Sequence, residues 1–378
     1  MVSLSVSCAE ADVDYNGSRM ELPRRDLIGT IFGINLAVGA TYALPQDSVD
    51  VADPRIAGVK HRYVQANGIK LHLAEQGAGP LVILCHGFPE SWYSWRNQFA
   101  PLANAGFRVA APDMRGYGKS ERPHEVASYD IMQLVGDIVG IVQSLGEGRA
   151  IIIGHDWGAT VAWHAALLRP DLFAAVAGLS VPFRQRGTAP PLRLLRQQGL
   201  HTYYWLYYQD VGVADAEYDR DIRESLRRTL FSLSGDAQRK DSNIRILKPG
   251  KGVLDNTINP EKLPAWLTEA DVDYMTADMT NGGFRGGLNW YRNIDRNWEL
   301  LAPWAGAVIQ QSALFIAGSE DHIINGPTGK TQMEAMKATV PNLQRQLLLE
   351  GAGHFVQQER PQVVNEELIQ FLRRVSIR

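Results

Sequence analysis

Three short stretches of the chain are continuously apolar, with no alternation of polar and apolar residues. They read LVILCHG (81–87), FRVAAPD (107–113) and AIIIGHD (150–156). Strands of this kind are buried on both faces, as in a parallel sheet covered by helices. Helix-like stretches lie between them, over 94–106 and 129–146. This alternation predicts an α/β fold, with a mostly parallel central sheet flanked by helices.

The alternation of strand-like and helix-like stretches follows a segment with the pattern of a β-hairpin, and it is interrupted once. Residues 63–77 alternate around an Asn-Gly pair, which predicts a β-hairpin. Between 183 and 300 aromatic and charged residues follow helical spacing, and apolar strand patterns resume at 313–321 and 345–354. The interruption predicts an α-helical cap inserted into the core. The expected divisions are an N-terminal extension (1–59), the first part of the core (60–182), the cap (183–304) and the second part of the core (305–378).

Composition excludes several classes of protein. Hydrophobic residues make up 45% and charged residues 21% of the 378 residues, enough for a large core. The formal net charge of −3 is too small to steer binding to nucleic acid or to an anionic membrane. The two cysteines, Cys8 and Cys85, make no disulfide framework, and Cys85 is expected in the core. Metal-ligand spacing and phosphate loops are absent from the sequence, so we expect no metal or cofactor.

The N-terminal extension has the layout of an export signal. Arg24 and Arg25 precede a moderately apolar stretch, 27–44, which ends in small residues at Ala40 and Ala43. The paired arginines resemble a twin-arginine signal. Three glycines and the polar residues Thr30 and Asn35 weaken the stretch as a membrane span, so we expect export without stable membrane insertion. The alternative is an amphipathic or disordered N-terminal extension on a cytoplasmic protein.

The pentapeptide Gly154-His155-Asp156-Trp157-Gly158 fits a strand–turn–helix elbow with aspartate in the nucleophile position. Such an elbow strains its central residue, so small residues must flank it. The first helix turn behind the elbow favours negative charge at its N-terminus. We therefore interpret Asp156 as a carboxylate nucleophile.

Three more features occur at strand ends. His86-Gly87-Phe88-Pro89 follows the first strand, where the Phe88 N–H and the Trp157 N–H would form an oxyanion hole. Asp321 ends a later strand and His354 follows the last one. The chain order nucleophile, acid, histidine is the order of α/β-hydrolases.

These motifs resemble the epoxide hydrolases of the α/β-hydrolase superfamily. The resemblance rests on the segments 86–96, 113–123, 154–159, 287–293 and 318–323 with 351–355, and it spans about residue 60 to the C-terminus. It implies that a small apolar epoxide and water give a diol, without a cofactor. A carboxylate suits attack at an sp³ carbon, because the resulting alkyl ester can be hydrolysed whereas an ether on serine could not. His354, oriented by Asp321, would be the general base for water.

The resemblance also implies two cap tyrosines that donate hydrogen bonds to the epoxide oxygen. Tyr291 in GLNWYRN (287–293) takes one position. The other falls among Tyr203, Tyr204, Tyr207 and Tyr208, and alignment of YYQDVG with the family points to Tyr204. Phe88, Trp157 and Phe355 are expected at the substrate-binding wall.

Two alternatives remain open at this point. Haloalkane dehalogenases share the Asp elbow, the histidine and an elbow tryptophan, but they typically carry a side-chain amide where this chain has Phe88. A non-catalytic binding protein on the same fold is the other alternative, since a fold does not fix a function. Such proteins lose the nucleophile, the histidine or the tyrosines, and this chain keeps all of them.

Overall fold

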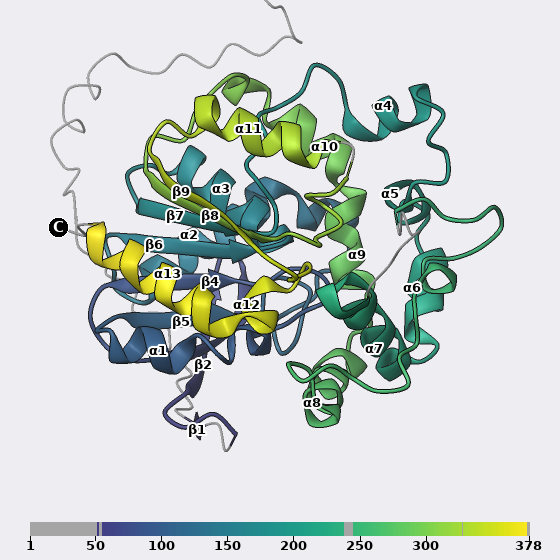
Figure 1. Ribbon diagram of the computed structural model, residues 1–378. Coiled ribbons are helices and arrows are strands. Elements are labelled where there is room, and N and C mark those ends of the chain that lie inside the picture. Colours follow the sequence, from purple (N-terminus) through teal and green to yellow (C-terminus); the bar gives the residue numbers. More distant parts are fainter. Residues whose placement is uncertain (1–50, 53–54, 238–244, 327, 376–378) are drawn as a thin grey trace, which may run out of the picture. The chain divides into compact units, whose positions relative to one another are not determined.

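The predicted mostly parallel sheet is confirmed by the computed structural model, which describes residues 51–52, 55–237, 245–326 and 328–375 (Figure 1). Its spatial order is β1-β2-β3-β5-β4-β6-β7-β8-β9. Pairs from β5 onward are parallel, and the pairs that involve β1, β2 and β3 are antiparallel. The strands are β1 (Val51–Ala52), β2 (Lys60–Ala66), β3 (Ile69–Gln76), β4 (Leu81–Cys85), β5 (Arg108–Pro112), β6 (Ala150–His155), β7 (Phe173–Leu179), β8 (Ser312–Gly318) and β9 (Leu343–Leu349).

The predicted hairpin is also confirmed. Strands β2 and β3 pair antiparallel, and Asn67 and Gly68 connect them with φ angles of 49° and 79°. Positive φ at both positions matches the right-handed twist of the strands, which explains the Asn-Gly pair. The sheet begins earlier than predicted, because β1 pairs with β2 inside the segment assigned to the extension. Two residues are too short for a sequence pattern to reveal this edge strand.

Helices cover both faces of the sheet. In Figure 1, α1 and α13 lie in front of the strands, and α2 and α3 lie behind them. Asp130 caps α2 by accepting hydrogen bonds from the N–H groups of Met132 and Gln133. Cys85 is fully buried in this core, as predicted. The core helices are α1 (Phe99–Asn104), α2 (Ile131–Ser144), α3 (Trp157–Leu168), α11 (Gly329–Thr339), α12 (Val356–Glu359) and α13 (Pro361–Arg374).

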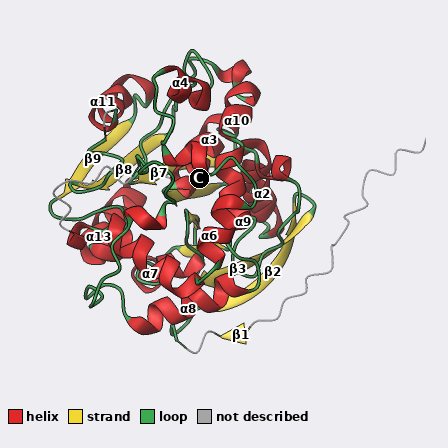
Figure 2. Ribbon diagram, turned by 90° about the vertical axis from the view of Figure 1, so that its right-hand side faces the viewer, coloured by secondary structure: helices red, strands yellow, loops and turns green. Residues whose placement is uncertain are grey.

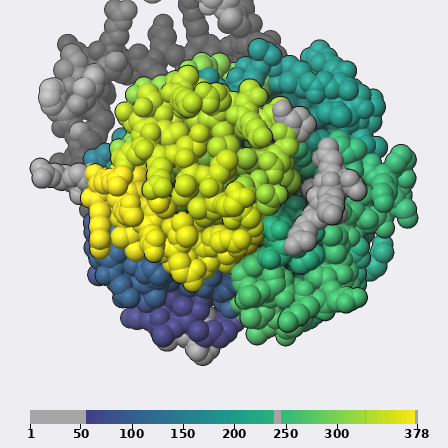
Figure 3. Space-filling view, viewed as in Figure 1, coloured from purple at the N-terminus to yellow at the C-terminus, as the bar shows by residue number. Residues whose placement is uncertain are grey.

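The segment between β7 and β8 is helical, and we refer to residues 183–304 as the cap. Its helices face the viewer in Figure 2, and α7 packs on α8. In Figure 3 the green surface of the cap adjoins the yellow surface of the C-terminal part of the core. The cap helices are α4 (Pro191–Gln197), α5 (Tyr204–Tyr207), α6 (Val213–Asp219), α7 (Ile222–Leu233), α8 (Glu269–Thr280), α9 (Arg285–Arg292) and α10 (Ile294–Leu300).

The topology places the functional candidates together. Because β4, β6, β7, β8 and β9 run parallel, their carboxyl ends meet at one edge of the sheet. The loops after these strands carry the predicted site residues. Within the described part of the chain, no helix is both long and apolar enough to cross a membrane. The predicted export signal lies outside the described residues.

Candidate active site

The elbow at Asp156 has the strained backbone that the sequence predicts. Asp156 joins β6 to α3 with φ 53° and ψ −120°, a region that residues with a Cβ rarely adopt. The turn leaves no room beside it. A Cβ at Gly154 would collide with the carbonyl of Gly158, and a Cβ at Gly158 would collide with the carbonyl of Cys85. The glycines therefore let strand, turn and helix approach closely enough to present Asp156 at the sheet edge.

The loop after β4 approaches the carboxylate from the other side. The Phe88 N–H donates a hydrogen bond of 2.8 Å to Oδ1 of Asp156. Gly87 makes this approach feasible, because a Cβ there would collide with the Asp156 side chain. The Phe88–Pro89 bond is cis. The Phe88 N–H thus contacts the carboxylate, as expected of an oxyanion donor, while the oxyanion roles of Phe88 and Trp157 stay predictions.

His354 lies between Asp321 and Asp156 and contacts both carboxylates. Nδ1 of His354 is 3.0 Å from Oδ2 of Asp321, and Nε2 is 3.4 Å from Oδ2 of Asp156. His354 and Asp321 are buried. Glu320, the neighbouring carboxylate, is exposed and contacts the Ser319 hydroxyl instead. The structure therefore brings Asp321, and not Glu320, to the histidine.

The two carboxylates and the imidazole between them stabilise one another's charged forms. Burial alone would raise the pKa of Asp156, but the hydrogen bond and charge of His354 outweigh it and hold that pKa below its ordinary value. Burial alone would lower the pKa of His354, but the carboxylates of Asp321 and Asp156 raise it well above its ordinary value. The pKa of Asp321 is lowered against burial by the same imidazole. The directions of the three pKa shifts therefore favour an imidazolium between two carboxylates.

A pocket with an empty volume of about 490 Å³ lies between the core and the cap. Asp156 and His354 line it from the core, and Tyr204 and Tyr291 line it from the cap. The rings of these two tyrosines are 5.9 Å apart in an edge-to-face arrangement. Burial raises the pKa of both phenols well above the ordinary value, so both keep their protons at neutral pH. Two protonated phenols therefore line the same pocket as the carboxylate.

The other tyrosines of the cluster have different surroundings. Tyr208 also lines the pocket, but its hydroxyl is engaged with the Tyr218 hydroxyl at 2.7 Å. Tyr203 and Tyr207 are not among the residues that line this pocket. The hydroxyl of Tyr204 is therefore the best placed of the four to meet a ligand, in agreement with the sequence alignment.

Of the three apolar residues expected at the substrate-binding wall, one lines the pocket and two lie behind its lining. Phe88 lines the pocket. Trp157 and Phe355 are not among its lining residues. Trp157 packs edge-to-face on Tyr291 with ring centroids 5.0 Å apart, and Phe355 is fully buried behind His354 at 5.3 Å. Both support residues of the pocket without forming its surface.

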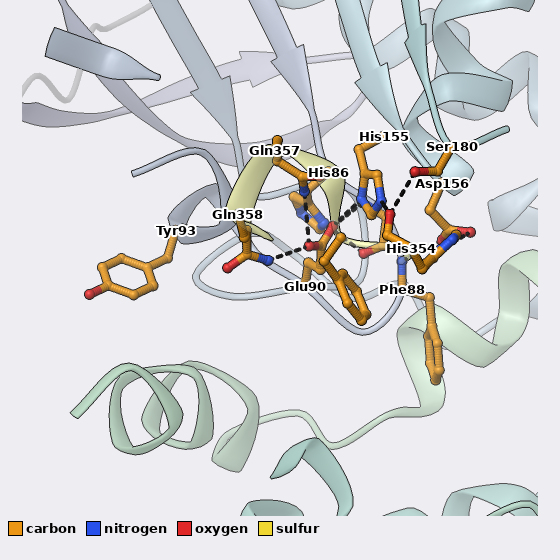
Figure 4. Close-up of polar contacts among 12 residues, drawn as sticks. His86, Phe88, Glu90, Tyr93, His155, Asp156, Ser180, His354, Gln357 and Gln358 are labelled. Atoms are coloured by element: carbon orange, nitrogen blue, oxygen red, sulfur yellow. Dashed lines mark hydrogen bonds and ion pairs between the residues drawn. The ribbon is translucent and has the colours of Figure 1, made fainter. Parts of the chain in front are cut away.

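A buried polar network behind the nucleophile escaped the sequence reasoning (Figure 4). The carboxylate of Glu90 accepts hydrogen bonds from the Gly87 N–H at 3.1 Å and from Nδ1 of His155 at 2.8 Å. Nε2 of His155 is 2.8 Å from the carbonyl oxygen of His354, which the Ser180 hydroxyl also contacts at 2.6 Å. Both ring nitrogens of His155 are therefore within hydrogen-bond distance of an oxygen, and the ring links Glu90 to the backbone of His354.

The position of Glu90 in the sequence is the one signal that could have indicated this network. Glu90 is the only acidic residue between Glu75 and Asp113, and aromatic residues surround it in FPESWYSW (88–95). A carboxylate in such a segment needs a buried partner. Its partner, His155, stands next to the nucleophile, where the sequence pattern drew attention to Asp156 alone.

Comparison with known proteins agrees with this geometry. Residues 80–361 match the model of the alpha/beta hydrolase fold family. Epoxide hydrolase A of Mycobacterium tuberculosis is 43% identical over 84% of this chain and 98% of its own length. Epoxide hydrolase 3 of Siraitia grosvenorii is 38% identical over 83% of this chain and 98% of its own length.

Solved structures give the same picture. An epoxide hydrolase from an endophytic Streptomyces has a TM-score of 0.81 and 44% identity, covering 84% of this chain and 96% of that chain. The crystal structure of epoxide hydrolase A from Mycobacterium thermoresistibile has a TM-score of 0.79 and 45% identity, covering 85% of this chain and 100% of that chain. The elbow, the pocket and these identities across nearly the full length of the relatives show that the chain belongs to the epoxide hydrolases of the α/β-hydrolase fold family.

Proposed function

We propose that this protein hydrolyses an epoxide to a vicinal diol through a covalent ester on Asp156. The observation that carries the proposal is the pocket in which a carboxylate faces the phenols of Tyr204 and Tyr291. An epoxide needs a nucleophile on one side and a proton donor on the other, because its leaving oxygen stays attached to the substrate. Phe88 lies where a haloalkane dehalogenase would carry a halide-binding amide, which favours the epoxide.

In the first step, Oδ2 of Asp156 attacks an oxirane carbon while the carbon–oxygen bond of the ring breaks. The Phe88 N–H holds Oδ1, which becomes the ester carbonyl oxygen. The oxygen released by ring opening takes a proton from a phenol of the pair Tyr204 and Tyr291. The depressed pKa of Asp156 keeps its carboxylate ionised at neutral pH and ready to attack.

In the second step, water attacks the ester carbon of Asp156. Esterification removes one of the two negative charges that raise the pKa of His354. That pKa therefore falls in the intermediate, and the imidazolium gives up its proton to restore the phenol that was deprotonated by ring opening. The neutral imidazole then accepts a proton from the attacking water. Asp321 holds the ring in position through Nδ1. The Phe88 N–H stabilises the oxyanion of the tetrahedral intermediate. When this intermediate collapses, the carbon–oxygen bond to the substrate breaks, the leaving alkoxide takes the remaining proton of the former water, and the diol and the Asp156 carboxylate result.

The experiment that tests the function compares three substrates on the purified protein and on Asp156→Ala. Styrene oxide tests the proposed reaction, a bromoalkane tests dehalogenation, and an aryl ester tests ordinary esterase activity. We expect diol from styrene oxide with the wild type and none with Asp156→Ala. Halide release without diol formation would refute the proposal in favour of dehalogenation, and binding without turnover would favour a receptor.

A single turnover in ¹⁸O-labelled water tests the covalent route. The oxygen added to the first diol must come from Asp156, so that diol should be unlabelled while the carboxylate gains the label. Mass spectrometry of the diol and of the peptide that contains Asp156 measures both. Label in the diol of the first turnover would mean that water attacks the epoxide directly.

We also propose that the protein is exported through the twin-arginine-type signal around Arg24 and Arg25, to the periplasm or the medium. The charge and apolar pattern of the sequence supports this proposal. Protein recovered from its native host should begin after the small residues near Ala40 or Ala43. N-terminal sequencing of the cell-free and cell-associated fractions measures this, and an intact N-terminus in a cytoplasmic fraction would refute it.

A further inference from the structure

The pocket contains a buried cation that the proposed reaction does not use. Arg245 lines the pocket together with Asp156, His354 and Tyr204, and only 8% of its surface is exposed. An apolar epoxide needs no positive charge in its binding site. Moving a guanidinium out of water is costly unless an anion compensates it, so a cation in this position requires an explanation.

No carboxylate among the described residues forms an ion pair with Arg245. Among the described residues, the hydrogen-bond partner of its side chain is neutral. The Tyr203 phenol shares a hydrogen bond with it, and the guanidinium charge offsets part of the increase that burial causes in the pKa of Tyr203. His322 lines the same pocket, and burial lowers its pKa to about 3, so it is neutral at physiological pH. Neither neighbour compensates the charge.

The backbone fixes Arg245 beside the proposed proton donor. The carbonyl of Arg245 accepts a hydrogen bond of 2.8 Å from the Tyr204 N–H, and the Leu247 N–H donates one of 2.8 Å to the Thr202 carbonyl. These two bonds flank the antiparallel bridge between Tyr203 and Ile246. These backbone hydrogen bonds therefore tie the position of Arg245 in the cap to that of Tyr204.

A glycine in the core leaves the space that the Arg245 guanidinium occupies. Gly326 follows the loop of Asp321, and a Cβ at Gly326 would collide with the Arg245 guanidinium. The guanidinium thus reaches from the cap across the pocket to the core loop that carries the acid of the triad. A planar fork of donors in this place suits a carboxylate, which it can bind in two parallel hydrogen bonds.

We propose that the preferred substrate is an epoxide that also carries a carboxylate group, and that Arg245 binds this carboxylate while Asp156 opens the ring. The inference rests on the proposed epoxide hydrolysis and names its substrate class. The guanidinium is a binding and specificity residue. It separates the substrate's negative charge from the nucleophile and orients the oxirane toward Tyr204 and Tyr291.

The test uses matched pairs of substrates at neutral pH. Terminal-oxirane epoxybutanoate, epoxyhexanoate and epoxyoctanoate are each compared with their primary amides, which have the same shape without the charge. We expect kcat/KM of the wild type to favour the acid over the amide for at least one chain length. Loss of a charge-assisted hydrogen bond in Arg245→Gln should reduce that preference by about 10- to 100-fold.

Two variants and one inhibitor series sharpen the result. Arg245→Lys keeps the charge but not the fork, so it should retain an intermediate preference. Arg223→Gln is the matched control, because Arg223 is a partly exposed cap arginine that pairs with Glu269 and Asp273 away from the pocket. In the wild type, phenylbutanoate should inhibit styrene oxide hydrolysis more strongly than phenylbutanamide. This inhibition does not depend on whether a variant folds.

The outcomes separate this inference from the proposed function. Turnover of styrene oxide and of the amides without any preference for acids would overturn the carboxylate inference and leave epoxide hydrolysis intact. Equal losses on acids and amides in Arg245→Gln would also overturn it, since Arg245 would then act on the charges of the triad. Absence of turnover on every epoxide would overturn the proposed function itself.

Discussion

The carboxylate of Glu90 offers a quantitative test of how the core holds the catalytic loops. Glu90→Gln keeps the size of the side chain and removes its charge. The carboxylate accepts from Gly87, His155, Gln357 and Gln358, and an amide carries a donor where the carboxylate has an acceptor. At least one of these donors therefore loses its partner. Leaving a buried donor without its partner costs about 1–3 kcal/mol, and the loss of a charged acceptor places this variant at the upper end, about 3 kcal/mol.

The loss has a measurable size and a pH dependence. In a chain of this length it corresponds to a fall in Tm of about 4 °C. Burial alone would raise the pKa of Glu90, but the charge and hydrogen bond of His155 outweigh it and lower the pKa. A lowered pKa stabilises the fold above the ordinary glutamate pKa, and the contribution disappears as the pH falls through the folded value. Wild type and variant should therefore differ fully above about pH 5 and converge in acid.

Activity should fall as well. His155 joins Glu90 to the carbonyl of His354, and the Gly87 N–H precedes the oxyanion donor Phe88. We expect a lower kcat with little change in KM, because the network orients catalytic groups and does not touch the substrate.

Urea unfolding across pH and steady-state kinetics measure these effects. Glu334→Gln is the control, because Glu334 is exposed and pairs with Lys337 on the surface, where a pair contributes at most about 1 kcal/mol. A Glu90→Gln variant with wild-type Tm and kcat would refute the view that this network supports the site. A stability difference that grows in acid would refute the assigned direction of the pKa shift.

Further variants test the site itself. Tyr204→Phe and Tyr291→Phe should each lower kcat/KM for styrene oxide by about 10- to 100-fold, and the double variant should lose the 10²–10⁴-fold contribution typical of acid catalysis; a fully active double variant would exclude the phenols as donors. Asp321→Asn should slow ester hydrolysis more than ring opening, so that a covalent intermediate accumulates in stopped-flow and mass measurements. Glu320→Gln should behave like the wild type, and the reverse pattern would reassign the acid.

The sequence determined the fold class for a local reason. Continuous apolar strands must be buried on both faces, and only a sheet with helices on each side buries them. The elbow was equally readable, because the close approach of Gly154 and Gly158 excludes any side chain there. The chain order of Asp156, Asp321 and His354 followed from their places after strands.

Contacts between segments distant in sequence were not readable. The partner of Glu90 is His155, 65 positions along the chain, and nothing local in either segment specifies the other. The same holds for the choice among the cap tyrosines. Alignment favoured Tyr204, but only the packed structure reveals that the hydroxyl of Tyr208 is engaged by Tyr218.

Sequence by itself thus determined the sheet, the elbow and the chemical type of the nucleophile, because each depends on short-range patterns of burial and backbone strain. Tertiary structure decided which groups share the pocket. Phe355 lies behind His354, whereas Arg245, unremarkable in the sequence, extends into the pocket. The reason is physical: the identity of a binding surface depends on how the cap packs against the core, and that packing is a property of the whole chain.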